Sequence, residues 1–248
     1  MLSNRKIAMI TGASRGIGEA IARAFAQEHY HLILTCHKNK DLLDALTHEL
    51  ESTYQISCLS FVGDIGDAAF VKSIFDTLDT MPIWHDIDVL VNNAGVSYIG
   101  LLSDMDPCDW QMVLHTNLTS AFLCSKYVIP KMVQKQSGKI INISSIWGNI
   151  GASMEVAYSA SKSGLNGFTR ALAKELAPSH IQVNAIACGV IDTTMNACFD
   201  ESEVTALIED IPADRLGRPD EVGQLALSLA ASGDYLTGQI IGLDGGWG

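Results

Sequence analysis

Short apolar runs alternate with segments of helical periodicity along the whole chain. Alternation of this kind is typical of βαβ units. Residues 1–248 are therefore expected to form one α/β domain, a Rossmann-type doubly wound parallel sheet of about seven strands with helices on both faces. The predicted strands are Ile7–Thr11, Leu32–Cys36, Ile56–Val62, Ile87–Val91, Lys139–Ser144, Ile181–Ala187 and Gln239–Leu243, and the longer helical segments are Asp109–Gln136, Val156–Ala177 and Pro219–Ala231. Such sheets bind ligands at the carboxyl ends of their strands.

Charge and hydropathy exclude several classes of protein. A net charge of −12 makes nucleic acid a poor partner, because binding to phosphates needs a basic surface. The chain has no apolar stretch long enough to span a membrane, and the apolar run after Lys6 is too short for a signal peptide. We therefore expect a cytoplasmic protein. The six cysteines form no C-x-x-C pair, so we expect free thiols, mostly buried, and no metal site.

A glycine-rich loop, Thr11–Gly18, follows the first predicted strand. Glycine is needed where backbone must approach a pyrophosphate closely, and the next helix, starting at about Gly16, would point its free N–H groups at the phosphates. The spacing is G-x-x-x-G-x-G, and the alternative is a turn without a ligand. The candidate contacts are Gly12, Ser14, Arg15, Gly16, Ile17 and Gly18.

The end of the second strand sets the choice of cofactor. An acidic residue there would bind the ribose 2′-hydroxyl of NAD, but this chain has Cys36, His37 and Lys38. No carboxylate would repel a 2′-phosphate, and Arg15, His37 and Lys38 could attract one. The pattern favours NADP(H). The alternative is that Lys38 is a solvated loop charge and that only Arg15 touches the cofactor.

Two further loops follow predicted strands. Asp64 could accept a hydrogen bond from the adenine amino group, with Ile65 against the ring, or Asp64 could cap the next helix. Asn92, Ala94 and Gly95 follow the fourth strand, where small residues allow a cofactor to come close. For Asn93, which lies between them, a structural role is the main alternative to a cofactor contact, since asparagine side chains can link neighbouring strands.

Tyr158 and Lys162 are four residues apart on a predicted helix and therefore share a face. A nearby ammonium group favours the phenolate, so Lys162 is expected to lower the pKa of Tyr158. The pair could protonate a carbonyl oxygen while hydride reaches its carbon, and Ser145, at the end of a strand, could donate to the same oxygen. The alternative is that the two residues only belong to the surface of a helix.

The motifs TGASRGIG and NNAG, followed by Asn117, Ser145, Tyr158 and Lys162, resemble the classical short-chain dehydrogenase/reductase family. The resemblance covers nearly the whole chain, to Asp244-Gly-Gly. It implies an NADP-dependent oxidoreductase with Tyr158 as general acid, Ser145 positioning the substrate carbonyl and Lys162 binding the nicotinamide ribose. It further implies that Asn117 holds a water molecule linking Lys162 to solvent.

The resemblance also implies a nicotinamide site and a quaternary structure. Ile191 and Thr193, after Gly189, would contact the carboxamide, residues 193–211 would form a substrate lid, and the protein would be a homotetramer. One position departs from the family, because Cys188 precedes Gly189 where a proline is usual. Cysteine does not stiffen a loop as proline does, and it places a thiol near the chemistry. The alternative is a small tolerated residue.

Within the family, the sequence is most similar to bacterial 3-oxoacyl-acyl-carrier-protein reductases of fatty acid biosynthesis. Residues 143–158, with Trp147 and Glu155, also resemble the reductase of the 5-aminopentanone modification of elongation factor P. Glu155 could pair with a substrate amine, or it could cap the following helix. A catalytically silent nucleotide-sensing protein is the alternative of another class, but it would need the loss of a catalytic residue, and none is lost.

Electrostatics bears on the substrate. The lid segment Asp200–Asp210 contains five carboxylates and no base, which disfavours an acidic carrier protein. Gln136 and Ser179 stand where the resemblance implies docking arginines. Three lysines are a partial counterweight: Lys131, Lys135 and Lys139.

Overall fold

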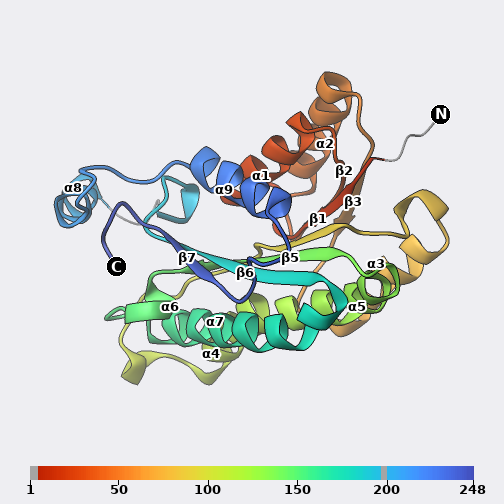
Figure 1. Ribbon diagram of the computed structural model, residues 1–248. Coiled ribbons are helices and arrows are strands. Elements are labelled where there is room, and N and C mark those ends of the chain that lie inside the picture. Colours follow the sequence, from red (N-terminus) through yellow and green to blue (C-terminus); the bar gives the residue numbers. More distant parts are fainter. Residues whose placement is uncertain (1–4, 197–199) are drawn as a thin grey trace.

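The computed structural model describes residues 5–196 and 200–248, and these contain one seven-stranded parallel sheet (Figure 1). The strand order is β3-β2-β1-β4-β5-β6-β7, and all neighbouring strands are parallel. This order confirms the predicted doubly wound α/β fold. The strands are β1 (Ile7–Ile10), β2 (His31–Cys36), β3 (Cys58–Val62), β4 (Val89–Asn92), β5 (Gly138–Ser145), β6 (Ile181–Cys188) and β7 (Ile240–Leu243).

Helices cover both faces of the sheet (Figure 1). One apolar cluster joins the sheet to α1, α2 and α9, and a second joins its other face to α3, α5 and α7. Each cluster is formed by apolar residues at helical spacing that face alternate side chains of the strands. The α-helices are α1 (Gly16–Gln27), α2 (Lys40–Tyr54), α3 (Ala68–Asp79), α4 (Pro107–Leu114), α5 (Ser120–Lys135), α6 (Trp147–Ile150), α7 (Val156–Leu176), α8 (Glu201–Asp210) and α9 (Pro219–Ala231).

The helical segment predicted over Asp109–Gln136 is interrupted in the structure. Between α4 and α5 the chain makes a π-helical turn, His115–Thr119. Such turns occur mostly as short bulges inside α-helices, frequently at functional sites. This turn carries Asn117 at the level of the carboxyl end of β4, where the Asn117 side chain hydrogen-bonds Val96.

Two of the sequence-based expectations concern composition rather than topology. No helix in the described ranges is long and apolar enough to cross a membrane. The five cysteines within those ranges are free, and three of them, Cys36, Cys124 and Cys188, are buried. The sixth, Cys198, lies outside the described residues.

Candidate active site

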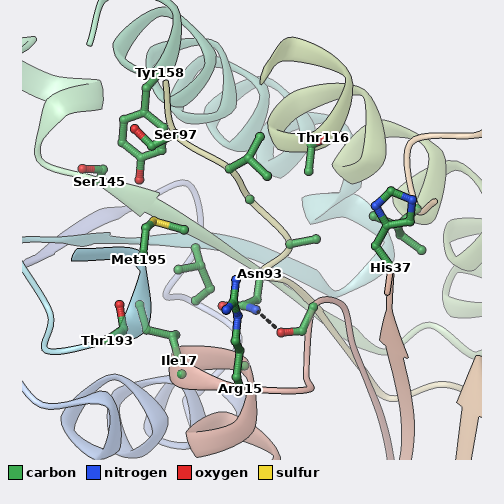
Figure 2. Close-up of a pocket in the computed structure, with 18 of the residues that line it drawn as sticks. Arg15, Ile17, His37, Asn93, Ser97, Thr116, Ser145, Tyr158, Thr193 and Met195 are labelled. Atoms are coloured by element: carbon green, nitrogen blue, oxygen red, sulfur yellow. Dashed lines mark hydrogen bonds between the residues drawn. The ribbon is translucent and has the colours of Figure 1, made fainter. Parts of the chain in front are cut away.

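A cavity of about 920 Å³ lies at the carboxyl ends of the strands. Its lining comes from the segments that follow β1 to β6. Figure 2 shows His37 toward one side of this cavity and Ser145 and Tyr158 toward the other, with Arg15 and Ile17 below them in the view. The cavity is thus elongated across the sheet, with the glycine-rich loop and the Tyr158 helix on its walls.

The glycine-rich loop comes very close to its surroundings. Gly12 has φ +68°, and a Cβ on Gly18 would lie 2.2 Å from the Gly12 carbonyl oxygen. The Asn93 amide donates to the carbonyl oxygens of Thr11 and Gly12, at 2.8 and 3.1 Å. Asn93 therefore binds the loop to the end of β4, as its structural interpretation predicted. Helix α1 begins at Gly16, which directs its free N–H groups into the cavity.

Three basic side chains line the cavity near the end of β2. Arg15, His37 and Lys38 are all exposed lining residues, whereas Cys36 is buried at the last position of the strand. Positions 36–39 contain no carboxylate. A phosphate group on an adenosine ribose would therefore meet positive charge here and no carboxylate from positions 36–39.

Asp64 lines the cavity together with Ile65. One oxygen of Asp64 accepts from the Gly66 N–H at 2.9 Å, and the other lies 3.3 Å from Nε2 of His115. The residue that caps α3 is Asp67, whose carboxylate accepts from the Ala69 N–H. The helix-capping alternative for Asp64 is therefore wrong, and the adenine contact remains open to it.

The loop after β4 corrects one predicted cofactor residue. Ala94 and Gly95 line the cavity, but Asn92 is not among the described residues that do. Its buried amide donates to Oδ1 of Asn142 at 2.8 Å and lies 3.4 Å from Oγ of Ser125. Asn92 points into the interior because it is still within β4, where it links two neighbouring strands.

Ser145, Tyr158 and Lys162 meet at the other end of the cavity. Ser145 ends β5, and the other two residues lie one turn apart on α7. Figure 2 shows Ser145 beside the Tyr158 hydroxyl, and Nζ of Lys162 lies 5.6 Å from the centre of the Tyr158 ring. The structure thus brings the three residues together in the lining of one cavity.

Burial sets the protonation of this group. It raises the pKa of Tyr158 above the ordinary value, and the nearby Ser145 hydroxyl offsets only part of that rise. The expected net lowering of the Tyr158 pKa is therefore wrong, because burial outweighs the neighbouring groups that favour the phenolate. Lys162 is 4% exposed and its Nζ donates to the Ile143 carbonyl at 2.8 Å. Burial lowers the pKa of Lys162 to about 8.

Asn117 lies behind Lys162 rather than on the cavity wall. Its side chain accepts from the Val96 N–H at 2.8 Å and donates to Oγ of Ser161 at 3.0 Å, and it is 2% exposed. A Cβ on Gly95 would lie 3.5 Å from both Oδ1 of Asn117 and Nζ of Lys162. Gly95 therefore lies close to both the Asn117 amide oxygen and the Lys162 ammonium group. The water relay from Lys162 to solvent through Asn117 stays a prediction.

The segment after β6 forms the cavity wall opposite α7. Gly189, Ile191 and Thr193 line it, as does Cys188. Burial raises the pKa of the Cys188 thiol to about 12, so the group is a neutral thiol at physiological pH. Of the predicted lid, residues 193–195 line the cavity, while residues 200–211 are not among the described lining residues and residues 197–199 lie outside the description. Figure 1 shows α8 projecting from the body of the fold.

Trp147 and Glu155 line the cavity beside Ser145 and Tyr158. Glu155 occupies the position before α7, but its side chain makes no capping hydrogen bond to the described residues of that helix. Its Oε2 instead accepts from Oγ of Ser97 at 2.6 Å. The capping alternative for Glu155 is therefore wrong. Ser97 was not foreseen, since the loop after β4 has no periodic pattern that would show which side chains point inward.

Several other lining residues also escape the sequence patterns. They include apolar side chains from three separate loops or helices, whose meeting depends on the tertiary fold. These residues are Val96, Ile99, Met112 and Met195. They give the substrate end of the cavity an apolar rim.

Comparisons with known proteins agree with this geometry. The profile of the short chain dehydrogenase family matches residues 6–204. An uncharacterized oxidoreductase of Bacillus subtilis, YmfI, is 37% identical over 243 residues, covering 98% of each chain. The 3-oxoacyl-[acyl-carrier-protein] reductase FabG of Thermotoga maritima is 38% identical over 242 residues, covering 97% of each chain.

Two solved structures share the whole fold. A putative gluconate dehydrogenase of Agrobacterium tumefaciens superposes with a TM-score of 0.92 at 32% identity, covering 99% of this chain and 96% of that one. YwfH, an NADPH-dependent reductase involved in bacilysin biosynthesis, also has a TM-score of 0.92, at 25% identity and 99% coverage of both chains.

Proposed function

The chain belongs to the short-chain dehydrogenase family of oxidoreductases, and we propose that it reduces a 3-oxoacyl thioester to a 3-hydroxyacyl thioester with NADPH. One observation carries the proposal. Ser145 and Tyr158 lie beside each other in a cavity that is also lined by the glycine-rich loop and by exposed basic side chains. Reductases of this specificity at 36–38% identity support the substrate class.

The residues present fit NADP(H). The close approach of Gly18 to Gly12 leaves no room for a side chain at Gly18, which keeps the loop tight, as a bound pyrophosphate requires. Arg15 and Lys38 would hold the 2′-phosphate, Asp64 the adenine, and Lys162 the nicotinamide ribose. When bound, the dinucleotide supplies the hydride. The remaining cofactor contacts in this proposal are Ser14, Gly16, Ile17, His37, Ile65, Ala94, Gly95, Gly189, Ile191 and Thr193.

The chain's own residues supply the proton and hold the ketone. The raised pKa of Tyr158 keeps a proton on its oxygen, from which it can pass to the substrate carbonyl oxygen. Ser145 donates a hydrogen bond to that same oxygen and polarises the carbonyl. The Lys162 ammonium stabilises the phenolate left behind, because an opposite charge nearby favours the ionised form.

A panel of ketones tests this function through the loss of NADPH absorbance. Acetoacetyl thioesters of N-acetylcysteamine and of acyl carrier protein would be compared with simple ketones. We expect thioesters to give the highest kcat/KM, and the Tyr158→Phe variant serves as the control for background oxidation. Reduction of simple ketones alone would overturn the proposed substrate class, and no reduction of any ketone would overturn the reductase function.

A second substrate class is favoured by the contact between Ser97 and Glu155. A carboxylate held at the substrate end of the cavity can pair with an ammonium group, as in the 5-aminopentanone modification of elongation factor P. We expect Glu155→Gln to raise KM for an amine-bearing ketone about tenfold and to leave a neutral ketone unaffected. Glu175→Gln is the matched control, because Glu175 is an exposed residue of the same helix that is not among the described lining residues. An equal effect on both ketones would contradict the amine assignment.

Surface charge bears on whether the substrate is carried by a protein. Three lysines could offset the acidic lid segment, but each of them is paired with a carboxylate. The pairs are Lys131 with Asp79, Lys135 with Asp88 and Lys139 with Asp234. The acidic side chains of α8 that the structure describes are exposed. We therefore expect carrier-borne thioesters to have no kcat/KM advantage over small ones at low salt. A large advantage that shrinks with added salt would show a basic docking surface.

The assembly we propose is a homotetramer. Large apolar side chains remain exposed on α4, α5 and α7, including Met112, Phe122 and Val156. Exposed patches of this kind commonly mark protein interfaces. Light scattering after gel filtration tests this, and a monomer would refute it.

A further inference from the structure

Trp147 forms part of the cavity wall two residues after Ser145. Its backbone N–H donates to Oγ of Ser145 at 3.2 Å. The short helix α6 that begins at Trp147 is pressed against α7, since a Cβ on Gly148 would lie 2.8 Å from the backbone carbonyl carbon of Lys162. The main chain of Trp147 is therefore fixed relative to the catalytic residues, but these contacts leave its indole free to turn.

The Trp147 indole packs against a second tryptophan, Trp247, from the C-terminal segment of the chain. The ring centres of Trp147 and Trp247 are 5.1 Å apart, and the rings meet edge to face at 69°. This geometry is favourable for an aromatic pair. Trp247 itself is not among the described residues that line the cavity, whereas the indole against which it packs belongs to a residue that does.

The segment Asp244–Gly248 carries Trp247 to this place. Gly245 and Gly246 have φ values of +69° and +87°, and Oδ1 of Asp244 accepts from the Gly246 N–H at 2.9 Å. A Cβ on Gly245 would lie 2.7 Å from Cγ2 of Ile211, the buried residue that follows α8. The two glycines thus let the segment turn sharply between α8 and Trp147.

We propose that Trp247 is a positioning residue that holds the Trp147 indole in place and thereby limits the size of the ketone substituent accepted beside Ser145. The inference rests on the proposed reductase function and goes beyond it. Without Trp247, the indole loses its support on one side and samples other rotamers, so a small ketone is held less well and a bulkier one gains room.

A double-mutant cycle tests this directly. In Trp247→Ala we expect KM for acetoacetyl-N-acetylcysteamine to rise about three- to tenfold, with kcat within twofold and the Kd for NADPH unchanged. The ratio of kcat/KM for 3-oxooctanoyl over acetoacetyl thioester should increase by a similar factor. Trp247→Phe should restore most of the wild-type behaviour, because phenylalanine can still form the aromatic contact. In a Trp147→Ala background, Trp247→Ala should have no further effect.

Additive effects of the two substitutions would overturn the proposal, as would an unchanged KM or a parallel loss of NADPH affinity. If Trp247→Ala does not fold, Trp247→Phe and Trp247→His give graded versions of the same cycle. A readout that needs no turnover separates this inference from the proposed function. Acrylamide quenching of the Trp147 fluorescence should increase in Trp247→Ala, with Trp110→Phe in both backgrounds as a control. Unchanged quenching would refute the support of Trp147 even if no ketone is reduced.

Discussion

The preference for NADPH over NADH should depend on two side chains, Arg15 and Lys38. Both line the cavity near the end of β2, where no carboxylate opposes a 2′-phosphate. A charge-assisted hydrogen bond contributes about 1.5–3 kcal/mol, and solvent exposure of both residues favours the lower end of that range. Since about 1.4 kcal/mol is a factor of ten, each bond should give roughly a tenfold preference. The double substitution Arg15→Ala, Lys38→Ala should therefore abolish most of the discrimination.

The measurement is kcat/KM for NADPH and NADH with one ketone, for each single variant and the double variant. Lys40→Ala is the matched control. Lys40 starts α2 close to the same loop, but it pairs with Asp44 and is not among the described lining residues. It should leave the ratio unchanged. Cys36→Asp places a carboxylate at the end of β2, and it should move the preference toward NADH.

Two outcomes would refute this reasoning. Comparable kcat/KM for both cofactors in the wild-type chain would show that no 2′-phosphate site exists. An equal loss of discrimination in Lys40→Ala would show that the NADPH preference comes from the overall positive potential of this region and not from direct contacts to the 2′-phosphate. Added salt separates these cases, because a field from exposed charges is largely screened beyond about 8 Å at physiological ionic strength.

Three further predictions concern the catalytic end and the strand that supports it. Tyr158→Phe should lower kcat by about 10²–10⁴ with the Kd for NADPH unchanged, and a variant retaining more than half the turnover would remove Tyr158 from the mechanism. Because burial lowers the pKa of Lys162 to about 8, its ammonium is present below that pH and lost above it. The kcat/KM for NADPH should fall as pH rises through about 8, and in Lys162→Arg the fall should move to higher pH; a flat profile in the wild type would contradict this. Asn92→Ala should lower the free energy of unfolding in urea by about 1–3 kcal/mol, because the buried Oδ1 of Asn142 loses its donor, while NADPH affinity stays the same. A weaker Kd at unchanged stability would restore Asn92 to the cofactor site.

The sheet could be predicted from the sequence because two periodicities and the short connections leave few arrangements open. The ends of the strands then follow, and with them the meeting of Ser145 with α7. Strand ends were less certain, since β3 begins at Cys58 and β4 at Val89, two residues later than predicted in each case. The apolar residues before them are buried in loops, and periodicity cannot distinguish these from strand.

Residue type alone could not assign neighbouring polar residues to their roles. Asp64 and Asp67 both follow β3, yet only Asp67 caps α3. Asn92 and Asn93 are adjacent, and one joins two strands while the other holds the glycine-rich loop. Such choices depend on the direction in which each side chain leaves the backbone, which only the folded chain determines.

The protonation states of Tyr158 and Lys162 could not be predicted from the sequence either. Burial shifts the pKa of each residue more than the other residue of the pair does. Burial disfavours the charged form of both groups, so it raises the pKa of Tyr158 and lowers that of Lys162. Tyr158 is therefore a neutral phenol that can give a proton to a carbonyl oxygen, as the proposed reduction requires. The same burial makes the phenolate that remains after proton transfer costly, so the site depends on a nearby positive charge to stabilise it.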